Sequence, residues 1–112
     1  MINSLSKVIR LLDITKSYVD DVTYVSKKGR DEFVLTEHGR SMIIYAELLT
    51  DDPRRAIDFG SISKWLPPHD HEILKHEDRE RVLRKFIQHL KMRRESYTVI
   101  SDLSNGKQHS LT

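Results

Sequence analysis

The stretch His76-Glu-Asp-Arg-Glu-Arg-Val-Leu-Arg-Lys-Phe-Ile-Gln-His-Leu-Lys-Met-Arg-Arg94 decides the fold of this chain. Its apolar side chains recur at the spacing that places them on one face of a helix. Acidic residues occupy the first turn and basic residues the last turn, in the order that the helix dipole favours. The sequence therefore predicts one long helix from about His76 to Arg94, whose apolar face consists of Val82, Leu83, Phe86, Ile87 and Leu90.

The opposite face of this helix is predicted to be solvated. Glu77 and Arg81, and likewise Glu80 and Arg84, have the acid-before-base spacing of four residues that supports an exposed helix. Basic residues such as Arg84 and Lys91 could contact phosphates, but they share this face with acids. No recognised nucleic-acid-binding motif is present. A solvated face is therefore favoured over a nucleic-acid interface.

A β-hairpin is predicted upstream of the helix. The segments Glu32 to Glu37 and Ser41 to Leu48 are rich in β-branched and aromatic residues. Between them, Gly39 supplies the positive φ that a tight turn needs. Arg55 to Phe59 is then predicted as a third strand, after the turn residues of Thr50-Asp-Asp-Pro53.

Shorter elements are predicted outside this hairpin. Val22 to Val25 and Tyr97 to Ile100 are β-rich runs, and Asn3 to Asp13 has helical spacing. The expected fold is α+β, an antiparallel β-meander of three to five strands packed against one long C-terminal helix, with a short N-terminal helix as an option. The whole chain, 1–112, is expected to form one domain, with 1–31 as an extra N-terminal segment and 101–112 as a flexible tail.

Composition narrows the function classes. The chain has no cysteine, which excludes disulfides, thiol catalysis and cysteine zinc sites. It has neither a span of membrane length nor a secretory signal pattern, so a cytoplasmic protein without a membrane partner is expected. The net charge of +2 is too small for the footprint of a nucleic-acid binder. Charge is nevertheless polarised: residues 51–78 hold seven acids and four bases, and residues 79–94 hold seven bases and one acid.

The most enzyme-like segment is His69-Asp70-His71-Glu72, followed by His76-Glu77. Imidazoles and carboxylates are common zinc ligands. No third ligand, however, falls at a recognisable helical or strand offset, and acids are expected before a helix in any case. The six histidines are scattered, and no phosphate loop or activated nucleophile is evident. We therefore expect no metal, no cofactor and no catalytic residues.

The segment Trp65-Leu-Pro67-Pro68 is the most distinctive in the chain. It holds the only tryptophan, and the proline pair bars a helix. We assign Trp65 a structural role in closing the core, with Pro67 and Pro68 directing the chain toward the helix. An aromatic partner contact is the alternative. The exposed acids around this segment are the more plausible contact surface.

The order of these motifs resembles a family of small bacterial immunity proteins from polymorphic-toxin and contact-dependent inhibition systems. The residues that carry the resemblance lie within 32–100. They are the turn His38-Gly39-Arg40-Ser41, Glu47-Leu48-Leu49, Ala56 to Phe59, Ile62-Ser-Lys-Trp65-Leu66-Pro67-Pro68-His69, Glu80-Arg81-Val82-Leu83 and Tyr97 to Ile100. The Trp-x-Pro-Pro-His segment is the most specific of these, and residues 1–31 match nothing in the family pattern.

The resemblance implies a protein that binds and neutralises the toxic C-terminal domain of a cognate toxin, with a nuclease as the expected activity of that domain. It transfers no catalytic residues. Two modes of inhibition are open: the acidic stretch fills a basic cleft, or the protein binds beside the active site and blocks access to it. We favour the first, with Asp51, Asp52, Asp70, Glu72 and Glu77 as candidate contacts. A small metal-binding or nucleic-acid-binding regulator or antitoxin is the alternative.

Overall fold

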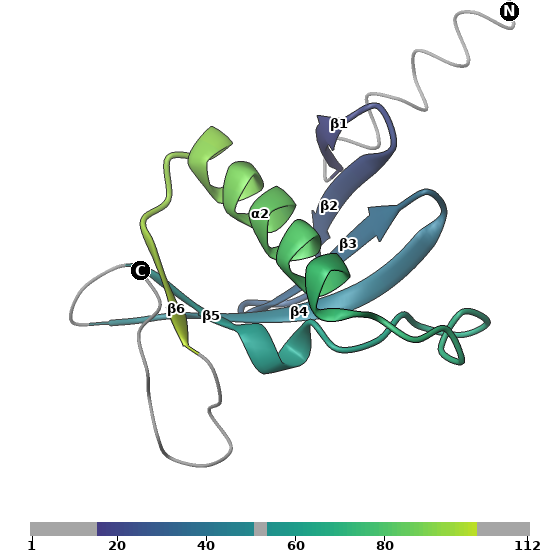
Figure 1. The fold of residues 1–112 in the computed structure, drawn as a ribbon. Helices are drawn as coiled ribbons and strands as arrows, with labels where there is room; N and C mark the ends of the chain where they lie inside the picture. The colour runs from purple at the N-terminus through teal and green to yellow at the C-terminus, as the bar shows by residue number, and fades with distance from the viewer. Residues whose placement is uncertain (1–15, 51–53, 101–112) are drawn as a thin grey trace, which may run out of the picture.

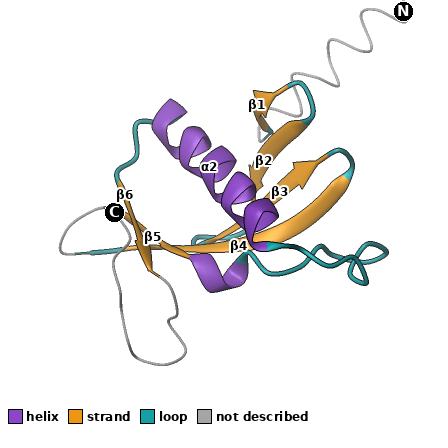
Figure 2. Ribbon diagram, in the orientation of Figure 1, coloured by secondary structure: helices purple, strands orange, loops and turns teal. Residues whose placement is uncertain are grey.

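The computed structural model describes residues 16–50 and 54–100. They form a six-stranded sheet, with strands in the order β1-β2-β3-β4-β5-β6, and a helix, α2, across one face of it (Figures 1 and 2). The fold class is therefore α+β, as predicted. The elements are β1 (Ser17–Asp20), β2 (Thr23–Lys27), β3 (Glu32–Glu37), β4 (Arg40–Leu48), β5 (Arg55–Asp58), the 3-10 turn η1 (Phe59–Ser61), α2 (His76–Met92) and β6 (Tyr97–Ile100).

The first five strands form the predicted antiparallel meander. The β3–β4 hairpin closes through two residues, His38 at φ 50° and Gly39 at φ 78°, between the paired Glu37 and Arg40. Positive φ at both central residues matches the twist of the flanking strands. The predicted role of Gly39 is thus confirmed, and His38 shares it.

The sheet has one strand more than predicted and is mixed. β1, at Ser17–Asp20, lies within the segment that matched no pattern, and it pairs with β2. β6 pairs with β5 in parallel, so the expectation of a purely antiparallel sheet was wrong. Parallel neighbours require a long crossover, which the helix and its connections supply between β5 and β6. The helix consequently precedes the last strand.

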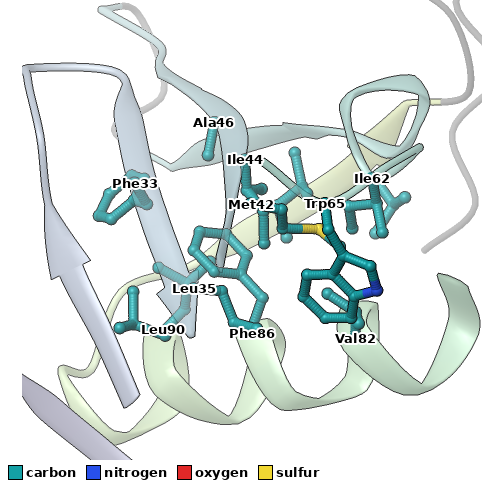
Figure 3. Packing of buried hydrophobic residues seen from close by; sticks show 13 residues of the cluster. Phe33, Leu35, Met42, Ile44, Ala46, Ile62, Trp65, Val82, Phe86 and Leu90 are labelled. Carbon is teal, nitrogen blue, oxygen red and sulfur yellow. The ribbon is translucent and has the colours of Figure 1, made fainter. Parts of the chain in front are cut away.

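The core lies between α2 and the sheet. Val82, Phe86 and Leu90 from α2 are fully buried, and they pack against side chains that alternate along the strands (Figure 3). Phe33 and Phe86 meet edge to face with ring centroids 5.1 Å apart. Burial of this apolar stripe stabilises the helix far more than its intrinsic propensity does. The strand residues in this cluster are Val25, Phe33, Leu35, Met42, Ile44, Ala46, Ile57 and Val99.

The helix ends two residues earlier than predicted. Arg94 has φ 58°, and its N–H donates to the Lys91 carbonyl, while the Glu95 N–H donates to the Leu90 carbonyl. These two bonds satisfy the last helical carbonyls in the Schellman arrangement. They also turn the chain so that Glu95 faces the sheet, where it meets Arg55.

The predicted N-terminal helix, Asn3 to Asp13, and the tail 101–112 lie outside the described residues. Within the described ranges, no helix has both the length and the apolar character needed to cross a membrane.

Candidate functional site

The connection between η1 and α2 carries the motif residues, and its first half is fixed to the core. Trp65 is only 4% exposed and packs with the core cluster, the structural position that the sequence predicts (Figure 3). The next N–H, of Leu66, donates to the Ser41 carbonyl at 2.7 Å. Pro67 and Pro68 are exposed and joined by a cis peptide bond. The chain is thereby tied to strand β4 before it turns outward.

The second half of this connection is fixed by Glu72. Its carboxylate accepts hydrogen bonds from Arg40 Nε at 2.7 Å and interacts with His69 Nδ1 at 2.9 Å. The Glu72 N–H donates to the His69 carbonyl at 3.1 Å, which closes a turn. The bond from Arg40, aided by that with His69, holds the pKa of Glu72 below its usual range. Glu72 is thus an internal brace for the loop.

One apolar side chain projects from this braced loop. Ile73 is 89% exposed, whereas its neighbour Leu74 packs against the core. Asp70 and Glu77 are exposed on either side of it in the sequence. Leu66 adds further apolar surface at 37% exposure. The loop and the start of α2 therefore carry exposed apolar and acidic residues close together in the sequence, which we call the Ile73 surface: Leu66, Asp70, Ile73 and Glu77.

The structure divides the five predicted contact residues. Asp51 and Asp52 lie outside the described residues. Asp70 and Glu77 are exposed and belong to the Ile73 surface. Glu72 is committed to Arg40 and His69, so its carboxylate contributes mainly to holding the loop.

A buried carboxylate lies where the end of strand β3 meets the helix, and it lines the same hollow as Ile73. Glu37 is 4% exposed, and it accepts two hydrogen bonds from Arg81 and one from Lys85, at 2.9, 2.8 and 2.6 Å. Burial alone raises the pKa of Glu37, but the bonds from the two cations outweigh it and hold the pKa below its usual range. Asp78 and Asp20 extend the network by pairing with Arg81 and Lys85, respectively.

Most basic residues of the helix form hydrogen bonds or ion pairs with other parts of the protein. Arg79 donates to the Phe59 and Ile62 carbonyls, and Arg81 and Lys85 are bound to Glu37. The predicted Glu77–Arg81 pair is therefore wrong, because Arg81 turns to the buried carboxylate and to Asp78 instead. Glu80 lies beside His76, at 3.4 Å, in place of the predicted pair with Arg84. The exposed bases on this helix and its end are Arg84, Lys91, Arg93 and Arg94.

The histidine-and-acid segment does not converge on one point. His69 bonds to Glu72, and His76 lies beside Glu80. In residues 16–50 and 54–100, no three histidines or carboxylates are placed to hold a metal ion.

A separate cavity of about 420 Å³ opens at the other end of the helix. Its walls include Phe33 and His89, and its rim carries Lys27, Arg93 and Glu95. Arg55 lines it as well, although this residue is only 3% exposed. Nε of Arg55 donates to Glu95 at 3.1 Å, and Nη1 donates to the carbonyls of Arg30 and Ala46 at 2.8 and 3.0 Å.

Sequence reasoning missed three buried ionisable residues, Glu37, Arg55 and His89, although their positions in the apolar pattern point to them. Glu37 continues the inward alternation of Phe33 and Leu35, and Arg55 lies two residues before the inward Ile57. His89 lies seven residues after the buried Val82. Each is polar at a position whose periodicity predicts burial.

No family model, no curated protein and no solved structure matches this chain. The likeness to immunity proteins therefore rests on the motif residues alone.

Proposed function

We propose that this chain is an immunity protein, which binds and neutralises the toxic C-terminal domain of a cognate bacterial toxin in the cytoplasm. It acts by binding and needs no cofactor. Its partner is a basic domain, with a nuclease as the expected activity. The observation that carries the proposal is Ile73, an isoleucine exposed over 89% of its side chain on a loop fixed at both ends.

The fixed loop supports a role in binding because its conformation is already ordered before a partner binds. Trp65 and the Leu66–Ser41 bond hold one end, and the Arg40–Glu72 pair holds the other. A segment already held in its bound conformation loses little entropy on association. An apolar side chain on such a segment gains free energy when a partner covers it.

The exposed acids near Ile73 in the sequence supply negative charge that would complement a basic cleft. Asp70 and Glu77 are exposed and lie outside the internal ion network. Exposed acids at the rim of an interface raise the association rate with a basic partner and make it sensitive to salt. Apolar burial at the centre and acids at the rim are the arrangement expected of a specific interface.

The test is co-expression with the toxin C-terminal domain encoded directly upstream, followed by co-purification and growth rescue. The proposal predicts a stable complex and rescue by the unaltered chain. Ile73→Lys should abolish rescue and weaken the complex about a hundredfold, since it buries an unpaired charge at the centre of the interface. Met92→Lys is the matched control: Met92 is 53% exposed at the far end of α2, and this variant should rescue fully.

Reversing the charges of Asp70 and Glu77, the acids at the expected rim of the interface, is a separate test. Asp70→Lys combined with Glu77→Lys should slow association about tenfold, with a smaller change in dissociation. Asp21→Lys combined with Glu47→Lys reverses two other exposed acids and serves as the control. Absence of a complex would reject the immunity function. A complex that both Ile73→Lys and the rim variant leave unchanged would move the interface elsewhere.

A further inference from the structure

The cavity at the C-terminal end of α2 has the composition of a ligand site. Its volume of about 420 Å³ falls within the range of small-molecule pockets. Val25 and Phe33 give it an apolar wall from strands β2 and β3. A cavity that combines an apolar wall with several charged groups suits a ligand that has both an apolar body and a charged end.

The charged groups that line this cavity determine which ligand charge it favours. Three cations line it, Lys27 from β2, Arg55 from β5 and Arg93 after α2, against the single carboxylate of Glu95. Glu95 already pairs with Arg55 at 3.1 Å and with Arg93 at 3.5 Å. Lys27 has no ion pair within the described residues. Arg55 also pairs with Asp31 at 3.5 Å, so the three cations are opposed by two carboxylates, and one further negative charge would balance the remainder.

The aromatic lining selects the shape of the ligand. Arg55 lies over the Phe33 ring, 5.1 Å from its centroid, and the Phe33 and His89 rings stand 6.0 Å apart at 68°. His89 is 3% exposed, and its Nδ1 has no hydrogen-bond partner. A buried polar atom without a partner is uncommon and costs stability, and a ligand oxygen that reaches it would supply the missing partner.

We propose that this cavity binds a small aromatic monocarboxylate, with the carboxylate toward Lys27 and Arg93 and the ring beside Phe33. This inference is independent of the toxin-binding proposal, because none of the cavity residues belongs to the Ile73 surface. Inorganic phosphate lacks the apolar body, and an uncharged aromatic lacks the anion. The two can therefore be told apart from the proposed ligand class.

The experiment titrates the full chain with benzoate and follows backbone amide shifts by NMR. We expect saturable shifts confined to residues around Val25, Phe33 and His89. Benzyl alcohol and inorganic phosphate should each bind at least about tenfold more weakly. If benzyl alcohol binds as tightly as benzoate, the cavity does not recognise the negative charge. If phosphate binds as tightly, the cavity does not recognise the aromatic ring. Either result, or the absence of saturable shifts, would overturn the proposal.

Two exposed side chains allow a test that leaves the core intact. Lys27→Gln and Arg93→Gln should each weaken benzoate binding about tenfold, because each removes one cation from the rim. Arg84→Gln removes a cation from the exposed face of the same helix and should leave the affinity unchanged. Unchanged affinity in both cavity variants would also overturn the proposal.

The imidazole of His89 gives a second readout. Burial and the charge of Arg93, opposed by Glu95, together lower its pKa to about 4. Lys27 and Arg55 are the other charged groups that line the cavity. A bound carboxylate should raise the pKa of His89, which an NMR pH titration with and without benzoate would detect. An unchanged pKa at saturating benzoate would contradict the binding of a carboxylate in this cavity and would overturn the proposal.

Discussion

Arg81 donates a hydrogen bond to each carboxylate oxygen of Glu37, from Nε at 2.9 Å and from Nη2 at 2.8 Å. This bidentate pair joins the second turn of α2 to the end of strand β3. The two residues are 44 positions apart, so the pair fixes where the helix lies along the sheet. Because Glu37 is buried, its charge depends on these bonds and on the ammonium of Lys85.

Replacing Glu37 by glutamine should lower the free energy of unfolding by about 2 kcal/mol. The amide keeps the shape of the side chain but loses the charge that accepts hydrogen bonds from Arg81 and Lys85. Urea unfolding followed by circular dichroism measures the change. Glu47→Gln, at an exposed position on β4, should change stability by less than about 0.5 kcal/mol. Equal stability of the two variants would show that the network is energetically neutral.

The same carboxylate should make the protein sensitive to strong acid. The folded pKa of Glu37 lies below its ordinary value of 4.5, so its contribution is complete above that pH. This contribution is lost as the pH falls through the lower, folded-state pKa. Wild type and Glu37→Gln should therefore differ in stability at pH 6 and converge under strong acid. Urea unfolding at a series of pH values tests this, and a difference that persists under strong acid would contradict it.

The buried His89 should cause a separate loss of stability in milder acid. Its folded pKa of about 4 lies below the ordinary value of 6.5, so the unfolded chain binds a proton that the native protein does not. Stability should fall as the pH drops from 6.5 to about 4, by at most about 3 kcal/mol, and this loss should be complete below pH 4. His89→Phe should remove the loss in this window, while His71→Gln, at an exposed position, should retain it. Urea unfolding at intervals across the window measures both.

The sequence predicts the elements of this protein better than their arrangement. The helix and the hairpin are predicted correctly because each is specified locally, by apolar spacing in α2 and by the glycine turn at Gly39. The position of β6 beside β5 was not predicted, because strand pairing across a crossover depends on packing between distant segments. β1 was missed because four residues are too few to show a clear alternation.

The candidate site was predicted only in part, for a similar reason. The sequence shows that acidic residues cluster around 69–77, but it does not show which of them are exposed and which form internal ion pairs. Glu72 meets Arg40, which lies 32 residues away, and this contact separates a bracing acid from the exposed Asp70 and Glu77. Ile73 was not singled out, because a lone isoleucine beside a helix start gives no sign of whether it will be buried.

The only tryptophan should report on the packing of the loop. Trp65 is 4% exposed, so its fluorescence should be blue-shifted in the native protein and should shift to red on unfolding. Trp65→Ala should cost about 3–5 kcal/mol, the usual range for a large aromatic residue lost from a core. Leu66→Ala, at the exposed neighbouring residue, should cost less than about 1 kcal/mol. A small effect of Trp65→Ala would mean that the loop is not held by the core.

Arg94 offers a stabilising substitution. Its φ of 58° is unfavourable for any residue with a Cβ, whereas glycine adopts it without strain. Arg94→Gly should therefore raise the free energy of unfolding by about 1 kcal/mol, because the Schellman bonds at the end of the helix are main-chain bonds and remain in place. Lys91→Gly is the matched control, because Lys91 is exposed in the last turn of α2. This variant should lower the free energy of unfolding by about 1 kcal/mol. Opposite signs for the two glycine variants in urea unfolding would confirm that the left-handed conformation, and not the loss of a basic side chain, decides the outcome.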